Sequence, residues 1–279
     1  MGKNEAVLSA LSPARRRVVL AMAALVAVAL VVAGASLVFQ AVNGSRAGAA
    51  ATSAQVPQDR PGPVLLVPGY GGSVTALSSL ARVLTAEGKD VTVVALPEDG
   101  RGDLRVQAQA LGAEASAVRT RTGARSVDVV GYSAGGVVAR YWVQELGGRA
   151  QTRRLVTLGS PNHGTDVAEL GALFEGACPI ACQQLLPTSS LLAALDRDVP
   201  ADGPRVVSIW TTVDDVVLPP DSARLTGALN VTVQSVCAAS EVRHSGLPAD
   251  PVVQHMVGAQ LGAGPPPQLG HGDCGRLST

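Results

Sequence analysis

Short runs of apolar residues, each followed by a longer stretch with helical periodicity, recur along the chain from about residue 63 onward. Apolar residues at three- to four-residue spacing predict helices around 77–84, over about 103–120 and 137–146, and near 252–261. Short strands that are apolar on both faces and alternate with helices indicate an α/β fold, with a mostly parallel central sheet and helices on both faces. The runs expected to form strands are Val64–Val67, Val91–Leu96, Val127–Val130, Leu155–Leu158, Val206–Thr211 and Val231–Val236.

The segment Val167–Pro204 interrupts this alternation. Because it breaks the rhythm of strands and helices and contains two cysteines, we expect it to form a cap or insertion over a site. With 279 residues, the chain is long enough for one α/β domain of the common size of about 200–250 residues.

An uncharged stretch, Val18–Phe39, precedes the alternating pattern and directly follows Arg15, Arg16 and Arg17. Its 22 residues would form a helix of roughly 33 Å, enough to cross the ~30 Å hydrocarbon core of a membrane. The basic residues before it predict a cytoplasmic N-terminus and an exported remainder. Cleavage of a signal peptide near Ala47–Ala49 is the alternative, although its apolar region normally spans only about 7–15 residues.

The pattern as a whole predicts five parts of the chain. We expect the folded domain and the tail to lie outside the cytoplasm, whether the anchor is kept or cleaved. The parts are a cytoplasmic N-terminus (1–17), a transmembrane anchor helix (18–39), a flexible linker (40–62), an α/β domain (63–263) and a Pro-rich, Cys-containing tail (264–279).

Charge and cysteine content narrow the expected partners and the compartment. Lys and Arg total 22, as do Asp and Glu, so no nucleic-acid partner is expected, because such binding needs a clustered positive excess. All four cysteines follow the anchor, and an even number in an exported protein favours two disulfides. Three connectivities are open, and pairing Cys178 with Cys182 and Cys237 with Cys274 is the simplest. The alternative is a metal site at His271 and Cys274, which lacks a second paired ligand spacing.

The strongest chemical signal is Gly-Tyr-Ser-Ala-Gly at residues 131–135, centred on Ser133. A serine hydroxyl becomes a good nucleophile only when an adjacent base takes its proton. The Gly-x-Ser-x-Gly pattern puts the serine on a tight turn between a strand and a helix, and both neighbours are predicted here. We therefore predict Ser133 as a nucleophile; an ordinary Gly-rich loop is the alternative.

A second signal is Pro-Gly-Tyr-Gly-Gly at residues 68–72, directly after the first predicted strand. Acyl transfer places negative charge on the carbonyl oxygen, which fixed backbone N–H groups stabilise. In this kind of site one donor is the amide after the nucleophile, here Ala134, and the other comes from the early loop. We predict Tyr70 as the second donor, with a plain turn as the alternative.

The four histidines compete for the role of base, and the expected chain order is Ser, acid, His. His163 precedes any plausible acid and is expected to be a positioning residue near the site. His255 lies in the last predicted helix and His271 in the tail. His244, in a loop after the last predicted strand, is therefore the expected base; a solvated loop histidine is the alternative.

An acid must orient this imidazole and stabilise its cationic form. Asp214 and Asp215 follow the strand predicted at Val206–Thr211, so either carboxylate can reach the site. The sequence Asp-Asp-Val-Val at 214–217 resembles the acid-x-x-Val of many such enzymes. We choose Asp214, with Asp215 as the alternative.

With these residues in place, the chain resembles the class 2 bacterial lipases, small α/β-hydrolases that act on acylglycerols and related esters. The resemblance runs from about Pro63 to Leu261. It rests on the 68–72 loop, the 131–136 turn, Thr-Leu-Gly-Ser-Pro-Asn-His-Gly at 157–164, the Asp214 loop, and His-Ser-Gly-Leu at 244–247.

The resemblance implies an α/β-hydrolase fold and a carboxylic ester hydrolase that works through an acyl-enzyme. It implies a small lipid or ester substrate and no metal or organic cofactor. Pro68 stands where many lipases carry histidine, and the long stretch before His244 contains Cys237, so we expect a disulfide to shape the His244 loop. A cell-envelope acyltransferase with the same triad and a non-catalytic binding protein on this fold are the alternatives.

Overall fold

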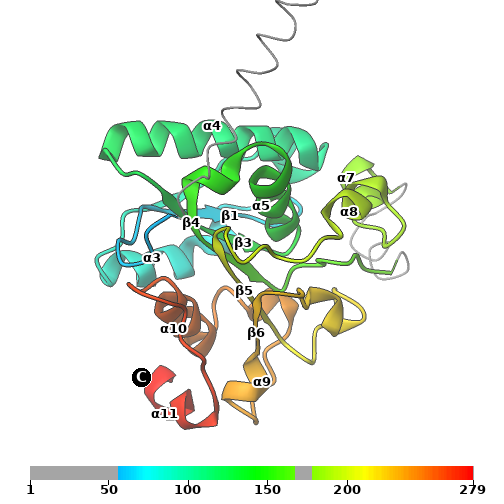
Figure 1. Ribbon diagram of the computed structural model, residues 1–279. Coiled ribbons are helices and arrows are strands. Elements are labelled where there is room, and N and C mark those ends of the chain that lie inside the picture. The colour runs from blue at the N-terminus through cyan, green and yellow to red at the C-terminus, as the bar shows by residue number, and fades with distance from the viewer. Residues whose placement is uncertain (1–55, 167–177, 279) are drawn as a thin grey trace, which may run out of the picture. The chain divides into compact units, whose positions relative to one another are not determined.

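The computed structural model describes residues 56–166 and 178–278, which belong to one compact unit, Gln55–Thr279. The described residues form a six-stranded sheet in the order β2-β1-β3-β4-β5-β6, and every neighbouring pair is parallel (Figure 1). This confirms the parallel sheet expected from the sequence. The strands are β1 (Val64–Val67), β2 (Val91–Val93), β3 (Val127–Tyr132), β4 (Thr152–Leu158), β5 (Arg205–Trp210) and β6 (Leu229–Thr232).

Helices cover both faces of this sheet. In Figure 1, α4 and α5 lie above it, and α3 and α10 lie below it. The α-helices are α3 (Ser78–Ala86), α4 (Leu104–Thr122), α5 (Ala134–Glu145), α7 (Ile180–Gln184), α8 (Ser190–Leu195), α9 (Val233–Val236), α10 (Pro251–Gln260) and α11 (Cys274–Leu277). The 3-10 helices are η1 (Thr75–Leu77), η2 (Pro97–Gly100), η3 (Gly148–Gln151), η4 (Pro220–Ala223), η5 (His244–Gly246) and η6 (His271–Asp273).

The four central strands, β1, β3, β4 and β5, supply two apolar cores, one on each side of the sheet. In β1, Leu65 packs into the core under α4 and α5, whereas Leu66 packs into the core over α3 and α10. Because successive side chains point to opposite faces and both faces are covered, the strands are continuous apolar runs instead of alternating ones.

Two predicted strands are shorter in the structure. The β2–β1 ladder ends where Val93 lies opposite Leu66, so β2 does not reach Leu96. The prediction of a strand through Val236 is wrong, because β6 ends at Thr232, opposite the last residue of β5. The Thr232 hydroxyl oxygen then accepts a hydrogen bond from the Ser235 amide (3.0 Å), which caps helix α9.

Strand β4 begins earlier than predicted, at Thr152, and therefore includes Arg153 and Arg154. Both arginines are buried. The Arg153 guanidinium pairs with Asp128 of β3, with Nε donating to Oδ1 at 2.8 Å. Burial raises the pKa of Asp128, although the Arg153 charge opposes that shift. Arg154 donates to the carbonyls of Gln260 and Gly264, and burial lowers its pKa to about 10. The strand predicted at Leu155–Leu158 left out both arginines, because unpaired charges are rarely buried.

The described part of the expected insertion joins the core on the α4–α5 side. Leu191 and Leu195 of α8 are fully buried there. Gln184 of α7 links this part to the start of α4: its Oε1 accepts from the Leu104 amide (2.8 Å) and its Nε2 donates to Asp103 Oδ1 (2.7 Å). Residues 167–177 lie outside the described residues.

Both disulfides follow the simplest predicted pairing, Cys178–Cys182 and Cys237–Cys274. These two bonds use every cysteine of the chain. The alternative of a metal site at Cys274 is wrong, because its sulfur is bonded to Cys237. Two disulfides are typical of a protein that folds outside the cytoplasm.

The expected anchor, 18–39, lies outside the described residues. Within residues 56–166 and 178–278, no helix combines the length and the apolar composition that crossing a membrane requires.

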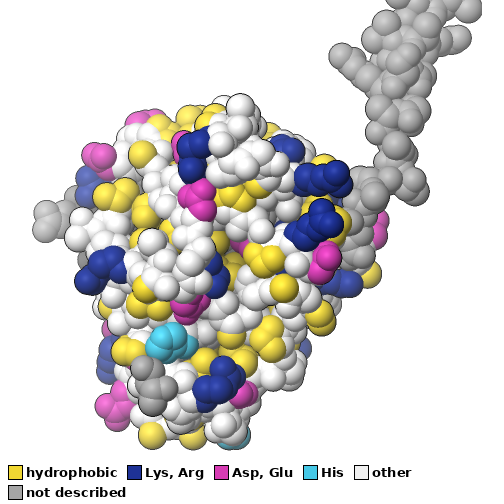
Figure 2. All heavy atoms as spheres, turned by 90° about the vertical axis from the view of Figure 1, so that its left-hand side faces the viewer, with side chains coloured by type: hydrophobic (Ala, Val, Ile, Leu, Met, Phe, Trp, Pro, Cys, Tyr) yellow, Lys and Arg dark blue, Asp and Glu magenta, His cyan; other side chains and the backbone are white. Residues whose placement is uncertain are grey.

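Surface charge is mixed in sign. Figure 2 shows basic and acidic side chains interspersed over the face that looks left in Figure 1. The ion pair between Arg121 and Asp90 (3.1 Å) has both side chains about half exposed to solvent. Exposed pairs of this kind typically contribute about 0–1 kcal/mol.

We expect Asp128→Asn to lower the free energy of unfolding by about 3–5 kcal/mol, because it leaves the buried Arg153 charge without its carboxylate. Asp90→Asn, which removes the exposed partner of Arg121, should change it by less than about 1 kcal/mol. Urea unfolding of both variants at neutral pH measures the difference. Equal effects would show that the buried pair contributes no more than the exposed one.

Candidate active site

The three residues predicted to form a catalytic triad meet at the carboxyl edge of the sheet. Ser133 follows β3, Asp214 follows β5 and His244 follows β6 and α9. Ser133 Oγ lies 3.0 Å from His244 Nε2, and His244 Nδ1 lies 2.9 Å from Asp214 Oδ2. Three segments that are far apart in the sequence therefore form one continuous chain of hydrogen bonds.

Ser133 has a left-handed backbone conformation, with φ 52° and ψ −127°, which is strained for a residue with a side chain. Its amide donates to the Leu158 carbonyl at 2.8 Å, and helix α5 begins at the next residue. The turn is tight, since a Cβ at Gly131 would lie 2.5 Å from the Gly135 carbonyl oxygen. The glycines of the Gly-x-Ser-x-Gly pattern are thus required by close backbone contact, and the half-buried Ser133 side chain stays accessible.

The two neighbouring aspartates have different contacts. Asp214 is buried, and its Oδ1 accepts from the amides of Val216 (2.9 Å) and Val217 (2.8 Å), which leaves Oδ2 to face His244. Asp215 is exposed and contacts the Arg243 guanidinium (3.3 Å) and the His244 backbone amide (3.4 Å). Only Asp214 contacts the imidazole, as the choice made from the sequence requires.

The loop at 68–72 packs directly against Ser133. It forms a turn closed by the Gly72 amide and the Gly69 carbonyl (3.0 Å), with Tyr70 inside the turn. Gly69 is so close to Ser133 that a Cβ there would lie 2.9 Å from the serine Cβ. Ala134 is the first residue of α5, where an amide has no acceptor within the helix. The two predicted oxyanion donors thus lie on two segments that border Ser133.

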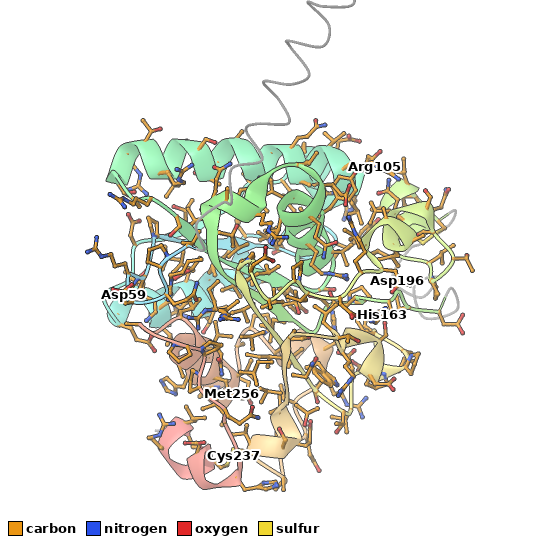
Figure 3. The ribbon with its side chains drawn as sticks, viewed as in Figure 1. Asp59, Arg105, His163, Asp196, Cys237 and Met256 are labelled. Carbon is orange, nitrogen blue, oxygen red and sulfur yellow. A yellow bond between two sulfur atoms is a disulfide. The ribbon has the colours of Figure 1, made fainter. Side chains whose placement is uncertain are left out.

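The other histidines make contacts elsewhere. His163 is exposed; its Nε2 lies 3.0 Å from the Arg224 carbonyl and its Nδ1 3.9 Å from Asp196, beside α8 (Figure 3). Its contacts therefore join the segment after β4 to the surface around Asp196 instead of orienting the triad. His255 Nδ1 lies 2.8 Å from the Leu277 carbonyl, which fits its exclusion as the base.

Tyr132, the residue before the nucleophile, was not singled out from the sequence. Its hydroxyl donates to the His244 carbonyl (3.1 Å), and its ring lies 5.3 Å from the imidazole, centroid to centroid. Burial raises the pKa of Tyr132, and the carboxylates of Asp214 and Asp215 raise it further, so the hydroxyl remains a donor. In the sequence, this role could have been found from the hydrogen-bonding side chain at the variable position before the serine in Gly-x-Ser-x-Gly.

Arg140 was also missed, because an arginine within a helix usually faces solvent. It is only 2% exposed, and it joins α5 to two other segments. Its Nη1 donates to the Asn162 carbonyl and its Nη2 to the Leu195 carbonyl, both at 2.7 Å. Asn162 in turn donates from Nδ2 to the Ala223 carbonyl (2.7 Å), so this network holds the 157–164 segment against α5.

The family model for class 2 lipases, "Lipase (class 2)", matches residues 115–254, half of the chain. The chain belongs to the class 2 lipase family. The matched region includes Ser133, Asp214 and His244. A search of curated protein sequences finds no match.

Of three solved structures similar to this class 2 lipase, two are described as lipases. Aspergillus fumigatus lipase B is 18% identical, with a TM-score of 0.63 over 78% of this chain and 60% of that chain. Bacillus licheniformis lipase BlEst2 in its mature form is 18% identical, with a TM-score of 0.50 over 63% and 84%. The lin2722 gene product of Listeria innocua is 18% identical, with a TM-score of 0.51 over 71% and 92%.

At these identities the structural likeness shows the α/β-hydrolase fold alone. This chain spans 60% of the length of the fungal lipase. The family model, and not these structures, supports a carboxylic ester hydrolase.

We expect Gly69→Ala to slow the labelling of Ser133 by a fluorophosphonate probe by about 10²-fold, because displacing a reacting group by about 1 Å has that effect. The added methyl group would press on the Ser133 side chain. Gly270→Ala is the control, since a Cβ there meets nothing within 4 Å. Unchanged labelling of the Gly69 variant would show that the 68–72 loop is not fixed against the nucleophile.

We expect Tyr132→Phe to lower the labelling rate by about fivefold, because losing one hydrogen bond of about 1 kcal/mol loosens the His244 loop. The rate should be measured across pH and compared with Tyr141→Phe, a tyrosine of α5 outside the triad. A structural defect alone would reduce the amount of folded protein, whereas a positioning role changes the pH profile of the folded enzyme. A profile identical to that of the parent would argue against this role.

Proposed function

We propose that this class 2 lipase is an extracytoplasmic carboxylic ester hydrolase that cleaves acylglycerol-like or other lipid esters with a Ser133–His244–Asp214 triad. The observation that carries the proposal is the unbroken path from Ser133 Oγ to His244 Nε2 (3.0 Å) and from His244 Nδ1 to Asp214 Oδ2 (2.9 Å). These distances suit proton transfer from the serine as it attacks a carbonyl carbon.

In the proposed mechanism, Ser133 Oγ attacks the ester carbonyl while His244 Nε2 takes its proton. Asp214 holds the imidazole in the tautomer with a proton on Nδ1 and stabilises the imidazolium that forms. His244 then donates its proton to the departing alcohol, which leaves an acyl group on Ser133. Water, deprotonated by His244, releases the carboxylic acid and restores the serine.

The tetrahedral intermediates carry a negative charge on the former carbonyl oxygen. We assign the amides of Ala134 and Tyr70 as its hydrogen-bond donors. Support comes from the position of Ala134 at the start of α5 and from the packing of the 69–72 turn on Ser133. Removing one such donor typically lowers the rate by about 10²–10³-fold.

Apolar side chains beside the site favour a lipid-like substrate. Val74 follows the 68–72 loop and is 48% exposed, and Val213 precedes Asp214 and is 43% exposed. Exposed apolar side chains on the segments that carry site residues suit an apolar acyl chain or alcohol. The family name supports the same substrate class.

We place the hydrolase domain, 63–263, outside the cytoplasmic membrane. The two disulfides support this location, because the cytoplasm keeps thiols reduced. The basic residues Arg15–Arg17 before the apolar stretch 18–39 support an uncleaved anchor, with 40–62 as the linker.

The test is hydrolysis of p-nitrophenyl esters of increasing chain length by the full-length chain. We expect Ser133→Ala to abolish turnover and Asp214→Asn to lower kcat by about 10⁴-fold, because the imidazole then favours the wrong tautomer. Asp215→Asn is the matched control and should retain most of the activity, since Asp215 contacts Arg243 and the His244 backbone amide but not the imidazole.

Activity that survives in Ser133→Ala would disprove the triad. A folded parent protein that cleaves none of the esters would contradict hydrolysis and favour a binding role. Turnover that depends on an added acceptor alcohol would replace hydrolysis with acyl transfer from the same acyl-enzyme.

A further inference from the structure

A second strained turn lies next to the 68–72 loop. Among the described residues, three that are not glycine have a positive φ: Ser133, Glu98 (52°) and Asp99 (50°). The last two are consecutive and belong to η2, in the connection between β2 and α4. Left-handed backbone at residues with side chains persists only where the surrounding structure imposes it, and it concentrates at functional sites. The η2 turn is therefore a candidate for a role beside the triad.

Both ends of this turn are anchored in the domain. Leu96 before it and Leu104 after it are buried in the core under α4 and α5. The Arg101 amide donates to the Glu98 carbonyl (2.9 Å), which closes the turn. The Asp103 side chain then caps α4 by accepting a hydrogen bond from its first turn (2.8 Å). The chain from 97 to 101 is thus held from both sides.

The turn touches the 68–72 loop through backbone alone. A Cβ at Gly100 would lie 2.7 Å from the Gly72 nitrogen and 3.2 Å from the Gly69 carbonyl oxygen. In the reverse direction, a Cβ at Gly72 would lie 2.5 Å from the Asp99 carbonyl carbon. Real Cβ atoms do not approach other atoms as closely as 2.5–2.7 Å. The two glycines are therefore needed for the close contact of these two segments.

The same loop meets Ser133 through Gly69, as described above, so the η2 turn, the 68–72 loop and the nucleophile turn are in direct succession. Tyr70 lies between Gly69 and Gly72, the two residues that the backbone of the η2 turn contacts. Its ring also lies 6.0 Å, measured to the centroid, from the guanidinium carbon of Arg101. A cation at this distance is attracted to an aromatic face. The segment that carries Tyr70 is thus contacted both at its backbone and at its side chain.

We propose that the Pro97–Arg101 turn is a positioning element of the active site. Its backbone at 99–100 fixes the 69–72 turn at the distance from Ser133 at which the Tyr70 amide binds the oxyanion, and Arg101 steadies the Tyr70 ring. Oxyanion donors are effective because their position is set before the reaction begins. The inference rests on the proposed function, since it takes Tyr70 as an oxyanion donor.

The test is the hydrolysis of p-nitrophenyl butyrate by the full-length chain carrying Gly100→Ala, with kcat expressed per site labelled by a fluorophosphonate. We expect kcat to fall by about 10²-fold, because the added methyl group displaces the loop and its donor. KM should change by less than about threefold, since an oxyanion donor acts in the transition state and not on bound substrate. A purely structural defect would lower the number of labelled sites instead.

Gly123→Ala is the matched control. Gly100 and Gly123 have the same φ of 68°, but a Cβ at Gly123 meets nothing within 4 Å. Both substitutions therefore place a side chain in the same unfavourable backbone conformation, and only the first presses on the 68–72 loop. We expect Gly123→Ala to keep the kcat of the parent. Equal kcat values in the two variants, or a raised KM with unchanged kcat in Gly100→Ala, would overturn the inference.

A second variant decides the matter if Gly100→Ala does not fold. Arg101 is exposed, and Arg101→Ala should lower kcat by about two- to fivefold through the loss of its contact with Tyr70. Arg105→Ala is its control, because it removes a contact of the same kind with Tyr141 (5.9 Å) and should leave kcat unchanged. With Gly100→Ala unfolded, an Arg101→Ala enzyme as active as the parent would overturn the inference.

Failure of the inference differs from failure of the proposed function. Hydrolysis by the parent with equal kcat in Gly100→Ala and Gly123→Ala would reject the positioning role and leave the hydrolase intact. A parent that cleaves no ester would reject the proposed function. The same two variants would then be compared by the rate at which a fluorophosphonate labels Ser133, and equal rates would reject the positioning role as well.

Discussion

The strained backbone at Ser133 is the feature on which the rest of the site depends. The Ser133 backbone keeps its angles of φ 52° and ψ −127° only because β3 before it and α5 after it are both fixed. The two apolar cores fix them: Leu65 and its neighbours pack under α5, and Leu66 and its neighbours pack over α3. The turn points the Ser133 hydroxyl out of the sheet edge, where His244 can reach it.

The residues that complete the site are held by hydrogen bonds instead of apolar packing. Asp214 is oriented by two backbone amides, and the His244 loop is held by the Tyr132 hydroxyl and by Thr211, whose hydroxyl donates to the Val242 carbonyl (2.7 Å). Loops cannot bury enough apolar surface to fix themselves, so polar contacts to the rigid sheet set their geometry. This division explains why a few polar residues at strand ends control the arrangement of the triad.

Buried arginines perform a similar task elsewhere in the domain. Aromatic residues make up only 3% of the chain, so Ala, Val and Leu form most of the core. Arg140 joins α5 to the loop after β4 and to the end of α8, and Arg154 holds the carbonyls of Gln260, the last residue of α10, and of Gly264. A planar guanidinium can donate to several carbonyls at once, which lets one side chain connect several segments. The Nε atom of Arg140 is buried and has no hydrogen-bond partner among the described residues.

The sequence by itself determined the class of fold and indicated the residues of the candidate site. Continuous apolar runs between helices required a parallel sheet covered on both faces, and Gly-x-Ser-x-Gly between a strand and a helix pointed to Ser133, because these signals are local. Three features could not be predicted from the sequence: the end of β6 at Thr232, the position of Arg153 inside β4, and the contact of Tyr132 with the His244 loop. Each of these depends on a partner far away in the chain: β5, Asp128 and the loop after α9. Only the tertiary structure brings such partners together, and burial then decides whether a polar side chain is solvated or paired.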